Sequence, residues 1–190
     1  MADDSDFPLP DDLPEPADDG GADHLPGVAV PSVSLSSTDG TAVDLSTISG
    51  RTVVYCYPKT GRPDEDAIPD GWETIPGARG CTPEACGFRD HYQELRDRGV
   101  SAVFGLSVQS SAYQREARDR LELPFELLSD ASFAFTDRLD LPMFEAAGER
   151  YLRRLTLVLA DGEVEHVFYP VFPPDEHAAA VVAWLEDNPA

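Results

Sequence analysis

Two cysteines, five positions apart, bracket the start of a predicted helix in the stretch Gly80–Asp90, which reads GCTPEACGFRD. Thr82 can serve as the N-cap of this helix, and Glu84 is an acid where the helix dipole favours one. A cysteine just ahead of a helix N-terminus lies near the positive end of the dipole, which stabilises a thiolate over a thiol. Because the thiolate is the nucleophilic form, we expect Cys81 to be a nucleophile and Cys86 its partner.

The spacing of the two cysteines limits how they can pair. In a regular helix, five residues give a rise of ~7.5 Å and a Cα–Cα distance of ~8.6 Å. A disulfide needs roughly 4.4–6.8 Å between the same atoms. A bond between Cys81 and Cys86 therefore requires the first helical turn to unwind, which is typical of a catalytic or redox-sensing pair rather than a structural one.

Other interpretations of the cysteines stay open at this point. Both residues can simply be small core side chains. A zinc site needs two more ligands, and among the four histidines only His91 is near in sequence. Cys56 lies within the apolar run TVVYCY and is expected to be an inert buried thiol.

Composition narrows the class of protein. The chain has 190 residues, enough for one domain or one domain and a tail, and its formal charge of −22 disfavours binding to nucleic acids or anionic membranes. We find no basic and apolar leader at the N-terminus, no run long enough to span a membrane and no glycine-rich phosphate loop. We expect a cytoplasmic protein that uses no cofactor and no metal.

The chain divides into a tail and a domain. Residues 1–26 are acidic and proline-rich and contain no lysine or arginine, so we expect a disordered tail, followed by a domain over residues 27–190. The domain should begin with a β-hairpin (28–35 and 41–45). Further strands are expected at 52–57, 100–108, 124–128, 152–160 and 164–169, and helices at 83–98, 110–121, 131–139 and 175–186. This order predicts an α/β fold with a mixed sheet and helices on both faces.

The stretch 58–80 interrupts this regular pattern. It is rich in proline and glycine and should form an irregular loop that leads into the cysteine pair. Long loops of this kind inside compact domains are often functional. Trp72 and Ile75 provide apolar anchors that can pack the loop against the domain.

Five segments carry a resemblance to a known family. They read YCYPKT, GCTPEACGFRDHYQEL, GLSVQS, LELPFELLSD and RLTLVLADGEVEHVF, and they occur in this order along the chain. Their order and spacing resemble the peroxiredoxins, most closely the Q-type subgroup, also called bacterioferritin comigratory proteins. The resemblance runs from about residue 28 to the C-terminus and implies a thioredoxin-like fold.

The resemblance also implies roles for particular residues. Cys81 would be the peroxidatic cysteine that attacks hydrogen peroxide or an alkyl hydroperoxide, and Cys86 would resolve it as an intramolecular disulfide. Thioredoxin or a similar dithiol would then reduce this disulfide. Arg154 matches the family arginine that stabilises the thiolate and the peroxide, with Arg153 as the competitor if the strand register differs by one. A monomer or a weak dimer is implied.

One departure from the family pattern concerns the peroxide pocket. The family carries a threonine or serine three residues before the first cysteine, and this position is Ala78 here; Thr74 stands where the family has proline. About sixteen residues are inserted between the YPKT segment and the cysteine. If the insertion loops out, Thr60 could supply the missing hydroxyl and Pro58 could shield the thiolate.

The departure keeps two further hypotheses open. The protein could be a redox sensor or interaction protein that uses the same disulfide switch without efficient peroxidase turnover. It could also be a non-catalytic member of the fold whose altered loop has lost the chemistry. Arg79, beside the cysteine, could add stabilisation of the thiolate or simply face solvent.

Overall fold

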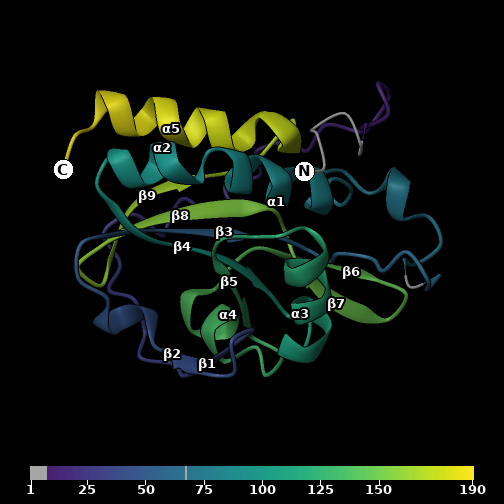
Figure 1. The fold of residues 1–190 in the computed structure, drawn as a ribbon. Coiled ribbons are helices and arrows are strands. Elements are labelled where there is room, and N and C mark those ends of the chain that lie inside the picture. Colours follow the sequence, from purple (N-terminus) through teal and green to yellow (C-terminus); the bar gives the residue numbers. More distant parts are fainter. Residues whose placement is uncertain (1–7, 67) are drawn as a thin grey trace.

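The computed structural model of the chain describes residues 8–66 and 68–190. Within these residues seven strands form one sheet in the order β2-β1-β5-β4-β3-β8-β9 (Figure 1). The pairs β3–β4 and β4–β5 are parallel and the other pairs are antiparallel, so the sheet is mixed, as predicted. The strands are β1 (Leu35–Ser37), β2 (Ala42–Val43), β3 (Arg51–Cys56), β4 (Val100–Ser107), β5 (Glu126–Ser129), β8 (Leu155–Ala160) and β9 (Glu163–Phe168).

Helices cover both faces of this sheet, which is also as predicted. Successive residues of β3 point to opposite faces, because side chains alternate along a strand. Val53 and Tyr55 pack with α1 and α5, whereas Val54 and Cys56 pack in a second core that includes Phe135 of α4. Figure 1 shows α5 running above α1 and α2 in one layer. The helices are α1 (Cys81–Asp90), α2 (Tyr92–Asp97), α3 (Ser111–Arg120), α4 (Ala134–Leu139) and α5 (His177–Asp187). No helix within the described ranges combines the length and hydrophobicity that a membrane crossing requires.

A small hairpin outside the main sheet was not predicted. Strands β6 (Met143–Ala146) and β7 (Glu149–Leu152) pair antiparallel around a turn in which Ala147 and Gly148 both have positive φ. Only the glycine of this turn signals such a conformation, because alanine rarely adopts positive φ. The hairpin matters for the site, since its aromatic side chains contact the loop that precedes Cys81.

Several predicted elements differ in extent. The strand expected over 152–160 is interrupted at residues 153–154, between β7 and β8. The single helix expected over 83–98 is wrong: it is broken into α1 and α2 at His91, whose φ of −92° and ψ of 7° leave the helical region. The apolar face continues across the break through Phe88 and Leu95, so periodicity could not locate it. In the first hairpin the turn at 38–40 lies as expected, but residues 28–34 contribute only the isolated bridge of Ala29 to Glu163.

Part of the segment expected to be a tail packs on the domain. Leu25 is fully buried and Ala22 is nearly so, and both belong to the core beneath β8. The Gly27 backbone N–H donates to the Val164 carbonyl at 2.8 Å. Residues 1–7 lie outside the described residues, and the boundary at residue 27 stays a prediction.

The packing of Leu25 gives a test of this segment. Leu25→Ala should lower the free energy of unfolding by about 2–5 kcal/mol, because it removes a fully buried side chain and leaves a cavity. Urea denaturation measures the change, with Leu13→Ala as a control at a half-buried position in the same segment. A loss below about 0.5 kcal/mol for Leu25→Ala would mean that the segment is a tail in solution.

Candidate active site

The first turn of α1 differs from the sequence prediction. The helix begins at Cys81 with Gly80 as its N-cap, so the expectation that Thr82 is the N-cap is wrong. Gly80 has a φ of +107°, and a Cβ at this position would collide with the Pro174 side chain. Glycine is therefore needed both for the backbone conformation and for the space. The result is that Cys81 occupies the first helical position, 5% exposed.

Arg154 lies directly beside the sulfur of Cys81. Its Nη2 donates to Cys81 Sγ at 3.2 Å and to the carbonyls of Ala78 and Arg79 at 3.3 and 3.2 Å. Its side chain is 1% exposed, and it enters the site from the position immediately before β8. Arg153 points elsewhere, since its Nε donates to the Met143 carbonyl. Of the two candidate arginines, Arg154 is the one in contact with the cysteine.

Glu84 completes the ionic group around Arg154. Its Oε2 pairs with Arg154 Nη1, and the carboxylate is fully buried one turn after Cys81. Burial raises the pKa of Glu84 to about 7, although the guanidinium opposes this change. Among the described residues, Glu84 Oε1 has no hydrogen-bond partner.

The ionisation of Cys81 reflects competing influences. Burial raises the pKa of the Cys81 thiol above its ordinary value, and the Glu84 carboxylate raises it further. The Arg154 guanidinium lowers it, as does a backbone hydrogen bond from Lys59. The Arg154 guanidinium thus faces both the Cys81 thiol and the Glu84 carboxyl. Because these two groups carry the same charge when ionised, ionisation of either one disfavours ionisation of the other. On balance burial outweighs the Arg154 guanidinium, so the pKa of the Cys81 thiol lies above its ordinary value.

Among the described residues, neither Thr60 nor Pro58 makes a polar contact with the Cys81 sulfur. Thr60 lines the same pocket as Cys81, and its hydroxyl donates to Gln109 Oε1 at 3.3 Å. The Gln109 side chain also accepts from the Thr60 N–H at 3.0 Å and donates to the Thr60 carbonyl at 3.1 Å. Pro58 is buried behind this segment. Gln109 therefore fixes the backbone that runs beside Cys81, a role that its sequence position did not indicate.

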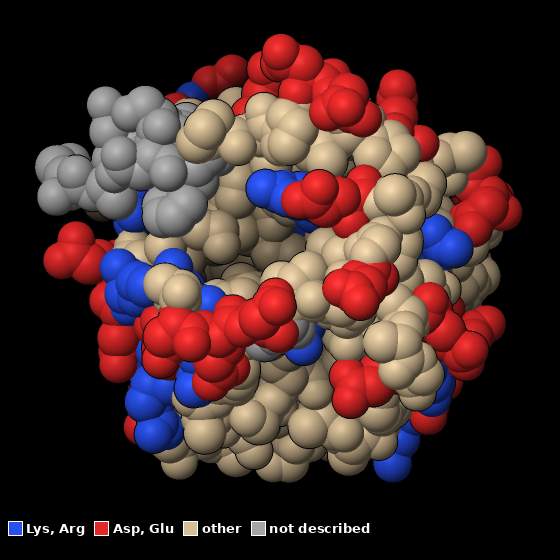
Figure 2. Space-filling model, turned by 90° about the vertical axis from the view of Figure 1, so that its right-hand side faces the viewer, with Lys and Arg blue, Asp and Glu red and all other residues tan. Residues whose placement is uncertain are grey.

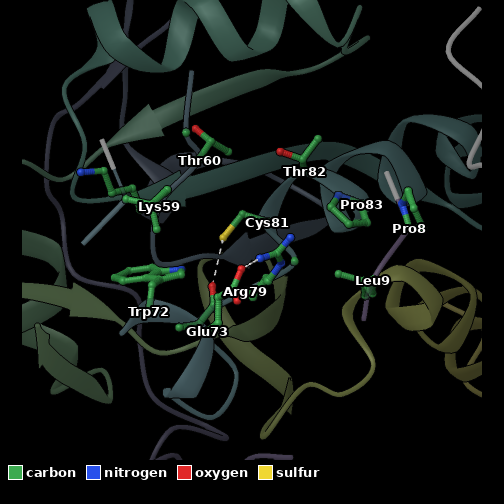
Figure 3. A pocket seen from close by; sticks show the side chains of 14 residues that line it. Pro8, Leu9, Lys59, Thr60, Trp72, Glu73, Arg79, Cys81, Thr82 and Pro83 are labelled. Atoms are coloured by element: carbon green, nitrogen blue, oxygen red, sulfur yellow. Dashed lines mark hydrogen bonds and ion pairs between the residues drawn. The ribbon is translucent and has the colours of Figure 1, made fainter. Parts of the chain in front are cut away.

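A pocket of about 530 Å³ opens over Cys81. The inserted loop forms much of its wall, and its short helix η3 (Trp72–Thr74) packs on the β6–β7 hairpin. Figure 3 shows Trp72 and Cys81 facing the same space, with Leu9 on the far side of the pocket. The loop expected to be irregular therefore builds one side of the candidate active site.

The charged groups around the pocket are mostly at its rim. Arg79 pairs with Glu73 and is 40% exposed, so it lies in the outer wall, and within the described part of the chain its side chain makes no polar contact with the sulfur. Figure 2 views the molecule from the side on which the inserted loop and the β6–β7 hairpin lie, and it shows acidic side chains distributed over this face around a hollow. Exposed ion pairs of this kind contribute little to stability.

The remaining cysteines are buried thiols that form no disulfide. Cys86 lies in α1 and is 2% exposed. Cys56 lies in β3 within the opposite core, and burial raises its pKa strongly, in keeping with the expectation of an inert thiol. Among the described residues, no group of three or more His, Cys, Asp or Glu side chains is arranged to hold a metal ion.

Comparison with known proteins gives consistent matches. The Redoxin family model matches residues 25–182. Peroxiredoxin Bcp of Escherichia coli is 31% identical over 167 residues, which cover 85% of this chain and 96% of that protein. A chloroplastic peroxiredoxin Q of Oryza sativa is 30% identical over 161 residues, 84% of this chain, and the match spans 66% of the rice protein.

Solved structures agree with the sequence matches. The peroxidoxin BcpB of Mycobacterium tuberculosis has a TM-score of 0.70 and 26% identity, with 88% of this chain and all of that chain covered. The bacterioferritin comigratory protein of Xanthomonas campestris, with a TM-score of 0.67 and 24% identity, covers 86% of this chain and 97% of that one. These likenesses confirm the expected thioredoxin-like fold.

Because Arg154 contacts both Cys81 and Glu84, substitutions of Arg154 and Glu84 should shift the pKa of Cys81 in opposite directions. Arg154→Met should raise this pKa, because the strongest influence favouring the thiolate is removed. Glu84→Gln should lower it, because a carboxylate that disfavours the thiolate is replaced by a neutral amide. The pH dependence of Cys81 alkylation by iodoacetamide measures both shifts. If the two variants shift the profile in the same direction, Arg154 and Glu84 do not act on Cys81 through charge.

Proposed function

Because this chain belongs to the Redoxin family, among peroxiredoxins of the Q and Bcp type, we propose that it is a thiol-dependent peroxidase that acts through Cys81. The observation that carries the proposal is the contact of 3.2 Å between Arg154 Nη2 and Cys81 Sγ inside a pocket open to small molecules. A buried cationic donor beside a sulfur favours the thiolate and stabilises charge that develops on a peroxide.

In the first step the Cys81 thiolate attacks one oxygen of hydrogen peroxide or an alkyl hydroperoxide. An S–O bond forms, the O–O bond breaks, and the other oxygen leaves as hydroxide or alkoxide and takes up a proton. The sulfur is oxidised to a sulfenic acid and the peroxide is reduced to water or an alcohol. Arg154 acts here as the donor nearest both the sulfur and the departing charge.

In the second step the Cys86 thiol condenses with the sulfenic acid. The S–S bond forms, the S–O bond breaks and water leaves. Both cysteines belong to α1, so the first turn must unwind before the sulfurs can meet. The first turn is buried and held by Arg154, so the proposed step requires it to open locally and to exchange these contacts for others.

An external dithiol completes the cycle. By thiol–disulfide exchange it returns Cys81 and Cys86 to thiols and leaves as a disulfide. A thioredoxin-like protein is the proposed reductant, on the strength of the family, and a cytoplasmic monomer or weak dimer is the proposed form. Pro58 and Thr60 are proposed to support the pocket, Pro58 by shielding the thiolate and Thr60 by its hydroxyl.

The proposal predicts the behaviour of two cysteine variants. Coupled consumption of NADPH with thioredoxin, thioredoxin reductase and peroxide should be lost in Cys81→Ser. In Cys86→Ser, Cys81 should still form a sulfenic acid, trapped by dimedone, but turnover should fall by at least about tenfold because the intramolecular disulfide cannot form. Cys56→Ser should behave as the wild type, since this thiol is buried in the opposite core.

Two outcomes would contradict the proposal. Full turnover in Cys81→Ser would assign the chemistry to another residue. Trapping of a sulfenic acid in the wild type without catalytic loss of peroxide would favour the alternative, a redox sensor that uses the same disulfide switch.

A further inference from the structure

We propose that the indole N–H of Trp72 donates a hydrogen bond to the peroxide in the Cys81 pocket. It would take over the role of the family's threonine or serine hydroxyl, which is missing here because the position is Ala78. The inference rests on the proposed peroxidase function and assigns a further catalytic residue to it. The indole belongs to the inserted loop, so this donor is a property of the present chain and not of the shorter loop in the family pattern.

The indole nitrogen is an unused donor that faces the pocket. Trp72 is 4% exposed and lines the same pocket as Cys81. Figure 3 shows the nitrogen edge of its ring on the side of Cys81. Within the described residues, the Trp72 N–H has no hydrogen-bond partner. Its nitrogen is accessible to solvent, so a molecule in the pocket can reach it. An indole nitrogen can only donate, so its natural partner is an acceptor atom that enters the pocket.

The ring is held in a fixed orientation by aromatic neighbours. Tyr151 of β7 packs edge-on against it, with ring centroids 5.0 Å apart and planes at 84°. Phe144 of β6 lies 5.5 Å away on the same hairpin. Such aromatic pairs restrict the ring without using its N–H, so the donor is preorganised toward the pocket.

Several other side chains near the sulfur carry donors, and most of these donors are engaged within the described residues. The Thr60 hydroxyl donates to Gln109, and Ala78 carries no hydroxyl at all. Arg154 directs Nη1 to Glu84 and Nη2 to Cys81 and two backbone carbonyls, so it acts chiefly at the sulfur, and its Nε is sealed from solvent without a partner among the described residues. Lys59 also lines the pocket, but Figure 3 shows its amino group directed away from Cys81. The Thr82 hydroxyl also lines the pocket and, like the Trp72 N–H, makes no hydrogen bond within the described residues. Of these two donors, only the indole is held in place by aromatic packing, so we assign the role to Trp72.

The chemical role follows from the charge that the reaction creates. As the thiolate forms its bond to one peroxide oxygen, negative charge grows on the other oxygen, which leaves as hydroxide or alkoxide. A fixed N–H directed at that oxygen stabilises the transition state more than the neutral peroxide. Trp72 transfers no proton and is not oxidised. The leaving oxygen is protonated from solvent.

The test compares two substitutions of tryptophan by phenylalanine. Trp72→Phe keeps an aromatic ring against Tyr151 and removes the N–H. Trp184→Phe is the matched control at the chain's other tryptophan, which lies on α5 and stacks on His166 at 4.5 Å. Two rates are measured for each protein: oxidation of Cys81 by hydrogen peroxide or cumene hydroperoxide, and alkylation of Cys81 by iodoacetamide, which needs the thiolate but no peroxide.

The expected result is a selective loss. Trp72→Phe should slow oxidation by both peroxides about 10- to 100-fold, while alkylation changes less than about twofold. Trp184→Phe should leave both rates unchanged. If Trp72→Phe folds poorly by circular dichroism, Trp72→benzothienylalanine makes the same comparison, since it replaces only the N–H by sulfur and keeps both rings.

Other results would overturn the inference. An equal fall in oxidation and alkylation would mean that Trp72 only supports the fold of the site. Wild-type oxidation rates in Trp72→Phe, together with a loss in Thr60→Val or Thr82→Val, would assign the donor to that threonine. Failure of the wild type to react with any peroxide would instead remove the proposed function, on which the assignment of Trp72 depends.

Discussion

The buried guanidinium of Arg154 joins two segments that are far apart in the sequence: the start of β8 and residues 78–84. It contacts the Cys81 sulfur and Glu84 on α1, and it also contacts the carbonyls of the loop that precedes α1. A buried cation needs such partners, because an unpaired charge in the interior costs several kcal/mol. The same contacts that satisfy the cation therefore fix the position of the nucleophile. Any movement of α1 has to exchange them for others.

The fold places this cation through ordinary strand and helix geometry. Arg154 immediately precedes β8, whose neighbour β3 leads into the segment carrying Pro58 and Thr60. Helix α1 packs over the same end of the sheet, and Gly80 allows its first turn to approach Pro174 closely. The inserted loop then closes the pocket by packing Trp72 on the β6–β7 hairpin. The site is therefore formed by the ends of the central strands β3 and β8, the first turn of α1 and the inserted loop.

Much of this arrangement could be predicted from the sequence, and the failures have physical causes. The strands at β3, β4 and β8 were predictable because buried central strands are short apolar runs. The start of α1 was misplaced because Thr82 has the chemistry of an N-cap, whereas Gly80 serves through its backbone conformation. The burial of Leu25 could not be foreseen, since the surrounding acids and prolines dominate the composition of that segment. Arg154 was predictable from its motif. The orientation of Trp72 depends on Tyr151 and Phe144, residues of a hairpin that the sequence did not indicate.

The central claim is that Cys81 is the nucleophile and that α1 unwinds to let Cys86 resolve it. Mass-spectrometric peptide mapping after one equivalent of hydrogen peroxide is added to the fully reduced protein tests this claim most directly. The account predicts a disulfide between Cys81 and Cys86 in nearly all molecules, with Cys56 still a free thiol. Recovery of Cys81 as an unmodified thiol, or of a disulfide that includes Cys56, would contradict it.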